Sequence, residues 1–319
     1  MSFGETMIRL AAPDHERLEV AAALELSIGG TESNVAVALA RLGRRVTWLS
    51  ALPANPLGRR IAGTLQSHGV DTSQVIWAED ARAGVYFLEP GASPRPTRVV
   101  YDRADSALAL IDPGALPYDE VARSRALHLT GITPALSANC ATACRRLVDR
   151  ASESGVPLIF DVNYRSLLWS PDEAARGLAF FVENANLLVC GRGDAATIWG
   201  IDGSADETAR ALLERSAARL AVVTDGDQGA TALTRDGEIY RQAAPEVQVI
   251  DPVGAGDGFL AGFLHVWLDA PDDIPGALRS GVALASLQMT MPGDLAIVTA
   301  DELAAAIAAL DASGADIIR

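Results

Sequence analysis

The second half of the chain alternates short, almost continuously apolar segments with longer amphipathic ones. The apolar segments, which have the length of buried β-strands, lie at 126–129, 157–162, 186–190 and 220–224. The amphipathic segments, whose apolar residues recur at helical spacing, lie at 137–154, 171–183, 194–199 and 205–216. Apolar strands that alternate with helices are typical of a parallel sheet with both faces covered, so we expect an α/β fold.

Shorter β-like segments lie in the first third of the chain, at 7–10, 18–20, 23–26, 46–50, 85–88 and 99–101. The stretches 7–28 and 83–104 are too short for a domain, and we expect them to form a small β-sheet lid. The remaining elements are helices at 33–42, 57–68, 275–289 and 300–310, and strands at 230–233 and 237–242. Because we find no internal repeat or linker, we predict one domain over 1–319.

The stretch 251–259 carries the clearest chemistry. Residues 246–250 before it alternate polar and apolar, which predicts a half-buried strand, and 259–268 after it has helical spacing. Three glycines in five positions let the backbone turn tightly at a helix start, where free N–H groups favour an anion. Asp257 beside them is a candidate base, so the pattern indicates phosphoryl transfer to a hydroxyl. A glycine turn with an aspartate N-cap fits the same spacing.

This stretch, Asp-Pro-Val-Gly-Ala-Gly-Asp-Gly-Phe, resembles the C-terminal signature of the ribokinase-like (PfkB) carbohydrate kinases. The resemblance implies that Asp257 is the catalytic base and that Gly254, Ala255 and Gly256 form the anion hole, with the two glycines contacting ATP. It also implies a ribokinase-like three-layer α/β/α fold, with a mostly parallel central sheet and the small β lid.

Two further stretches resemble the substrate side of this family. Ile-Gly-Gly-Thr-Glu-Ser-Asn at 28–34 resembles its sugar-binding signature, and Asp-Val-Asn-Tyr-Arg at 161–165 resembles fructokinases and 2-keto-3-deoxygluconate kinases. Paired glycines allow a polyol close to the backbone, and an amide both donates and accepts hydrogen bonds. The substrate-binding residues implied by these stretches and by the lid are Gly29, Gly30, Asn34, Tyr86, Tyr101, Arg103 and Arg165. A glycine loop and lid packing of the tyrosines are the structural alternatives.

The residues that resemble the family's nucleotide and metal sites match its motifs less completely. Asn163 is implied to lie near the phosphates, and the segment around Thr224, Gly226 and Gly229 resembles the family's ATP loop. The family's Asn-x-x-Glu motif, which organises the waters around Mg²⁺, is replaced here by Gly191 and Asp194. We keep Asp194 as a candidate metal residue and expect an altered requirement for Mg²⁺.

Composition excludes several other classes of protein. The formal net charge of −15 argues against a nucleic-acid partner, and no apolar run is long enough for a membrane helix. The chain start has no signal pattern, so we expect a cytoplasmic protein. Three cysteines are too few for a disulfide framework, and we expect Cys140 and Cys144 to pack in a helix; none of the four histidines is a predicted ligand.

The sequence therefore predicts ATP-dependent phosphorylation of a primary hydroxyl on a sugar acid, with 2-keto-3-deoxygluconate as the expected substrate. A fructokinase-like or other PfkB sugar kinase is the first alternative, and a sugar-binding protein with weakened catalysis is the second. Gly-Arg-Gly-Asp-Ala-Ala at 191–196 also fits a dinucleotide fingerprint, but Asp225, over thirty residues on, is too distant for its acidic partner. No P-loop motif is present. We expect a homo-oligomer that associates through the lid.

Overall fold

The predicted apolar strands form the middle of one eight-stranded sheet, in the order β14-β13-β12-β11-β10-β9-β1-β4. These strands are β1 (Ser2–Phe3), β4 (Trp48–Leu49), β9 (Leu127–Thr130), β10 (Leu158–Asp161), β11 (Leu187–Gly191), β12 (Leu220–Thr224), β13 (Ala230–Thr234) and β14 (Ile239–Gln242). Neighbouring strands are parallel except at the hairpin β13–β14 and its pairing with β12. This computed structural model describes residues 1–315, so the last four residues of the expected 1–319 domain lie outside it.

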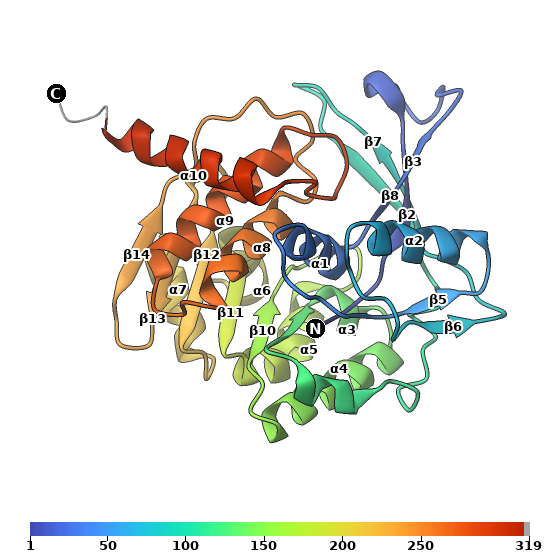
Figure 1. The fold of residues 1–319 in the computed structure, drawn as a ribbon, viewed down its shortest axis with the longest axis horizontal. Helices are drawn as coiled ribbons and strands as arrows, with labels where there is room; N and C mark the ends of the chain where they lie inside the picture. The colour runs from blue at the N-terminus through green and yellow to red at the C-terminus, as the bar shows by residue number, and fades with distance from the viewer. Residues whose placement is uncertain (316–319) are drawn as a thin grey trace.

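Successive residues of each central strand enter opposite layers of the core. Ile159 packs in a cluster with α1 (Thr31–Arg41), α8 (Ala255–Trp267) and α9 (Ile274–Met289), whereas Phe160 packs in the cluster on the other face. The helices of that second face are α4 (Ala138–Glu153), α5 (Pro171–Asn184), α6 (Arg192–Trp199) and α7 (Ala205–Glu214). The alternation follows from the period of two along a strand. It produces the three-layer α/β/α architecture that the sequence predicted (Figure 1).

The two early β-rich stretches form a separate four-stranded sheet in the order β3-β2-β7-β8. Its strands are β2 (Met7–Ala11), β3 (Glu25–Gly29), β7 (Val85–Glu89) and β8 (Arg98–Asp102), at the upper right of Figure 1. The large hydrophobic side chains exposed on it are Leu26, Val100 and Tyr101. Association of two copies through this sheet stays a prediction.

The smaller elements complete the fold. They are α2 (Pro56–Ser67), α3 (Ile132–Ala135), α10 (Ala300–Ala315), the strand pair β5 (Ala51–Pro53) and β6 (Ile76–Ala78), and the 3-10 turns η1 (Pro13–His15), η2 (Tyr118–Arg123) and η3 (Gly226–Gln228). Over residues 1–315, no helix is long and apolar enough to cross a membrane. The three cysteines are buried and free, which confirms the expected packing role of Cys140 and Cys144.

Two predicted strands are wrong. Residues 18–20 form a turn, and 246–250 have no strand partner although their side chains alternate between apolar and polar. Val249 and Ile250 are more than half exposed, and the Ile250 N–H donates to the carbonyl of Met289 rather than to a strand. The alternation was misleading because a strand also needs a neighbour for its backbone groups. The helix of the central motif begins at Ala255, four residues earlier than predicted.

Candidate functional site

Most of the predicted site residues line one cavity of about 670 Å³. It lies where β10, β11 and β12 end, beside the small sheet, which is the edge where ligands bind in open α/β sheets. The predicted residues that line it are Gly29, Gly30, Asn34, Tyr86, Tyr101, Arg103, Asn163, Arg165, Asp194, Thr224, Gly254, Ala255, Gly256 and Asp257. Segments that are far apart in the sequence therefore meet at one place.

Gly226 and Gly229 do not line this cavity. Gly229 has φ +93° and lies so close to β14 that a Cβ there would be 2.1 Å from the carbonyl oxygen of Gln242. This close approach explains the glycine without a ligand. A Cβ on Gly226 would meet open space. Contact of these two glycines with ATP stays a prediction.

Asp257 lies in the first turn of α8 and is 8% exposed. Its Oδ2 accepts a hydrogen bond of 2.7 Å from Nδ2 of Asn34, the residue predicted to hold the sugar. Burial raises the pKa of Asp257 well above its usual value, and the Asn34 hydrogen bond opposes that shift. The amide of Asn34 thus orients the carboxylate of Asp257 at the cavity wall.

The backbone before Asp257 forms a cradle for an anion. Gly254 is the N-cap of α8 with φ +86°, a conformation that favours glycine, and no described side chain caps the helix. A Cβ on Gly254 would lie 2.5 Å from the backbone oxygen of Asp294. We call residues 254–257 the anion cradle, because they line the cavity at the N-terminal end of α8, the positive end of the helix dipole.

Carboxylates dominate the cavity wall. Besides Asp257 and Asp194 it contains Glu5, Glu32, Asp161 and Asp294, whereas Arg103 and Arg165 are its two guanidinium groups. Burial is the largest cause of a raised pKa at Glu32, Asp194 and Asp294, and it raises the pKa of Asp161 to about 7. An anionic ligand therefore needs the cradle, the arginines or a bound cation to offset this negative charge.

The sequence interpretation missed four of these acids. Asp161 begins the Asp-x-Asn-x-Arg motif and Glu5 follows the first glycine, so each stood beside a recognised feature. Glu32 accepts hydrogen bonds from the hydroxyls of Thr130 and Thr133, about a hundred residues away. Asp294 lies in a loop without any motif. Only the folded chain shows that Asp294 belongs to the site, whereas Glu32 lies inside the recognised stretch 28–34.

Arg103 already has a partner in this cavity. Its Nε and Nη2 donate to Oε2 of Glu5 at 2.8 and 2.5 Å, and its guanidinium lies 5.7 Å from the ring centroid of Tyr101. Arg165 is exposed, and its one hydrogen bond among the described residues is a long one, 3.4 Å, to the carbonyl of Tyr164. Of the two arginines, Arg165 is therefore the one whose charge is left for a ligand.

Tyr86, which was predicted to bind the substrate, is almost completely buried, with 4% of its surface exposed. Its hydroxyl donates to Oδ2 of Asp294 at 2.7 Å, and its ring lies 5.9 Å from that of Tyr101. Tyr101 is 37% exposed on the edge strand β8. Tyr86 thus connects the small sheet to the cavity wall, while Tyr101 is the more accessible of the two to a ligand.

Asp161, Asn163 and Asp194 provide oxygen atoms suited to Mg²⁺. Asn163 has φ +39° and donates from Nδ2 to Oδ2 of Asp161 at 3.0 Å, while its own Oδ1 is buried without a partner. Asp194 Oδ2 accepts from the N–H of Tyr164 at 3.1 Å. Carboxylate and amide oxygens are the ligands that Mg²⁺ takes, alongside water. The oxygen types suit Mg²⁺, although the part of the chain that the structure describes holds no group of three or more His, Cys, Asp or Glu side chains placed to bind a metal ion.

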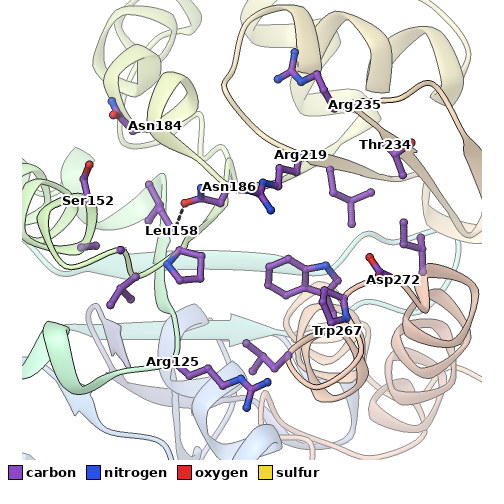
Figure 2. Close-up of a pocket in the computed structure, with 18 of the residues that line it drawn as sticks. Arg125, Ser152, Leu158, Asn184, Asn186, Arg219, Thr234, Arg235, Trp267 and Asp272 are labelled. Carbon is purple, nitrogen blue, oxygen red and sulfur yellow. Dashed lines mark hydrogen bonds between the residues drawn. The ribbon is translucent and has the colours of Figure 1, made fainter.

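A larger cavity, of about 960 Å³, lies at the other end of the parallel strands, where β10, β11 and β12 begin (Figure 2). Its wall includes Leu158, Asn186, Arg219, Arg235 and Trp267, and none of the predicted site residues. Asn186 Oδ1 accepts from the N–H of Leu158, and Arg235 donates to nearby backbone carbonyls. These polar groups support strand ends. The smaller cavity, which combines a buried base with an anion cradle, is therefore the candidate active site.

Comparison with known proteins agrees with this geometry. A 2-dehydro-3-deoxygalactonokinase of Haloferax volcanii is 43% identical over 303 residues, covering 95% of this chain and 94% of that protein. A 2-dehydro-3-deoxygluconokinase of Bacillus subtilis is 30% identical over 312 residues, covering 97% and 95%. The crystal structure of a 2-dehydro-3-deoxygluconokinase from Thermotoga maritima superposes with a TM-score of 0.91 at 30% identity, covering 96% of this chain and 97% of the other.

The family assignment rests on the whole length of the fold. The family model described as pfkB family carbohydrate kinase matches residues 1–300, which include the small sheet, the cavity and the anion cradle. Together with the relatives above, this match shows that the chain belongs to the pfkB family of carbohydrate kinases.

Proposed function

We propose that this carbohydrate kinase transfers the γ-phosphoryl group of ATP to a primary hydroxyl of a 2-keto-3-deoxy sugar acid. The observation that carries the proposal is the buried Asp257, oriented by Asn34 at the end of the anion cradle. Two relatives named for the phosphorylation of such acids support the substrate class. The sequence motifs favour the gluconate form, whereas the relative at 43% identity is named for the galactonate form.

The residues divide the reaction between them. Asp257 accepts the proton of the attacking hydroxyl, so the oxygen becomes a better nucleophile as the new P–O bond forms. The N–H groups of the anion cradle stabilise the charge on the transferring phosphoryl group. Asp161, Asn163 and Asp194 would hold Mg²⁺ through their oxygen atoms or through waters, and the metal would supply positive charge that offsets the charge of the phosphates. Thr224, at the end of β12, lines the cavity, and we propose that it contacts the nucleotide.

A substrate panel tests the proposal directly. With ATP and Mg²⁺, we expect ADP release with 2-keto-3-deoxygluconate, 2-keto-3-deoxygalactonate or both, and at most weak release with fructose. Comparing kcat/KM for the two acids decides which epimer is preferred. Efficient turnover of fructose alone would move the protein to the fructokinase-like alternative. Binding of an acid by calorimetry without any ADP release would instead indicate a sugar-binding protein.

Arg165 is expected to select the acid. Replacing it with Ala removes a charge-assisted contact worth about 1.5–3 kcal/mol, so KM for the acid rises about ten- to a hundredfold. Turnover of fructose, which has no carboxylate, changes little. Steady-state kinetics of the variant on both sugars measures this difference.

Two further variants help to interpret the kinetics of Arg165→Ala. Arg82→Ala removes a small-sheet arginine that pairs with Asp102 outside the cavity, and it leaves both activities unchanged. Arg103→Ala also raises KM for the acid, although it strands the buried Glu5 as well. Equal losses on acid and neutral sugar in Arg165→Ala would show a structural role and favour a neutral ketose.

The altered metal motif leads to a separate prediction. Restoring the family pattern with Gly191→Asn and Asp194→Glu lowers the Mg²⁺ concentration for half-maximal rate by about tenfold, because outer ligands organise the metal's waters. A Cβ on Gly191 would meet Asp194 at 3.6 Å, an ordinary contact, so the substitution fits. Gly193→Asn, where a Cβ meets open space, is the matched control. An unchanged Mg²⁺ titration would assign the metal to other groups.

A further inference from the structure

Arg9 is a buried arginine that lies outside the cavity wall. It belongs to β2 of the small sheet, is 4% exposed, and was not singled out by any motif. Its Nη1 donates to Oδ1 of Asp294 and its Nη2 to Oδ2 of Asp251, both at 2.5 Å. One guanidinium therefore joins two carboxylates that are 242 and 285 residues away in the chain.

Both carboxylates support the anion cradle. Asp251 Oδ1 accepts from the N–H of Val253 at 3.0 Å, which fixes the turn leading into Gly254. Asp251 Oδ2 also accepts from the N–H of Gly293, the residue before Asp294. The backbone oxygen of Asp294 in turn lies where a Cβ on Gly254 would stand. The loop at 293–294 and the turn at 251–254 are thus joined by hydrogen bonds, and Arg9 forms an ion pair with an aspartate in each.

Arg9 is also the cation that balances this part of the site. Burial is the largest cause of the raised pKa of Asp257, and the nearby carboxylates of Asp161 and Asp294 raise it further. Without Arg9, Asp251 and Asp294 would be two buried carboxylates lacking their shared partner, a costly arrangement that displaces or protonates them. A planar guanidinium can contact both acids at once, whereas a lysine ammonium on one stem is a point charge.

We propose that Arg9 is a positioning residue that sets the geometry of the anion cradle from the small sheet, acting through Asp251 and Asp294. This rests on the proposed phosphoryl transfer. Arg9 does not itself line the cavity and reaches it only through Asp251 and Asp294, so we expect its main effect on the transition state rather than on substrate affinity. A displacement of about 1 Å at a reacting centre can cost about a hundredfold in rate.

The test compares Arg9→Lys and Arg9→Met with the unaltered protein by steady-state kinetics and thermal unfolding. We expect Arg9→Lys to lower kcat by about ten- to a hundredfold and Arg9→Met by more, with KM for sugar and for ATP changed by less than about threefold. Arg95→Met, which breaks the pair with Glu89 on the same small sheet, is the control and keeps kcat. If Arg9→Met does not fold, Arg9→Lys carries the test alone.

A double-mutant cycle separates positioning from plain stability. Arg9→Lys combined with Asp251→Asn lowers kcat by less than the product of the two single losses, because both act through one contact. A fall in melting temperature with unchanged kcat would overturn the proposal, as would multiplicative losses or a change confined to KM. Failure of the proposal for Arg9 is distinguishable from failure of the proposed function. If only the Arg9 proposal fails, the unaltered protein still phosphorylates the acid.

Discussion

Replacing Asp257 with Asn is expected to lower kcat by about 10²–10⁴-fold, because the substitution removes the base that accepts the hydroxyl proton. The side chain keeps its size, so the cavity keeps its shape and KM for the sugar changes little. In the unaltered protein, kcat/KM is expected to fall on acidification, because the base works only when it is deprotonated. The midpoint of that fall lies above about 3.9, the pKa of an ordinary aspartate, because burial raises the pKa of Asp257.

The same variant is expected to be more stable than the unaltered protein at neutral pH. A carboxyl group whose pKa is higher folded than unfolded binds more protons in the folded state, so stability is lost as pH rises from the unfolded pKa toward the folded one. Removing the ionisable group removes that loss, and the amide that replaces the carboxylate stays paired with Asn34 or a water. The melting temperature should therefore rise while activity falls, a stability–activity trade-off.

Asp236→Asn is the matched control for both measurements, since Asp236 is exposed on the β13–β14 turn, far from the base. It should leave kcat and the melting temperature unchanged. Near-normal turnover in Asp257→Asn would exclude the residue as the base. A lower melting temperature in that variant would show instead that its carboxylate stabilises the fold.

Replacing Gly254 with Ala is expected to lower kcat by about 10²–10³-fold, the effect of losing one donor from an oxyanion hole. The added methyl group would stand 2.5 Å from the backbone oxygen of Asp294, and neither backbone segment can move without shifting the cradle. The φ of +86° adds strain of about 1–2 kcal/mol for a residue with a Cβ. Kinetics and thermal unfolding together measure both consequences.

Gly200→Ala separates these two causes. Gly200 is the C-cap of α6 with φ +64°, and a Cβ there would meet nothing within 4 Å. It should lose about 1–2 kcal/mol of stability with kcat unchanged. If Gly254→Ala behaves in the same way, with full activity per folded molecule, the close packing against Asp294 has no part in positioning the cradle.

Local pattern was enough to predict most elements and the cradle itself. The central strands are apolar over their whole length, and the glycines around Gly254 stand at the start of a helix in the sequence as in the structure. Residues 246–250 failed because alternation reports only on side chains, and the missing strand partner is a long-range property. Motifs likewise placed Asn34 in the site without indicating that its amide faces Asp257.

What the sequence could not predict is the set of contacts between distant charges. Glu5 compensates Arg103, and Arg9 joins Asp251 to Asp294, yet none of these pairs has a fixed spacing. Their partners are chosen by the packing of the small sheet against the loop at 293–294. Counting both Arg103 and Arg165 as cations that await an acid therefore overestimates the free positive charge in the cavity.

The hydrogen bond between Asn34 and Asp257 spans 223 residues, which has a consequence during synthesis of the chain. At about 5–20 residues per second, a ribosome needs roughly 11–45 s to produce the base after it has produced the amide that orients it. During that interval the chain completes its predicted sugar-binding residues, the last of which is Arg165, before it has a cradle. A nascent chain stalled before α8 would thus display Gly29, Gly30 and Asn34 to solvent while being unable to consume ATP.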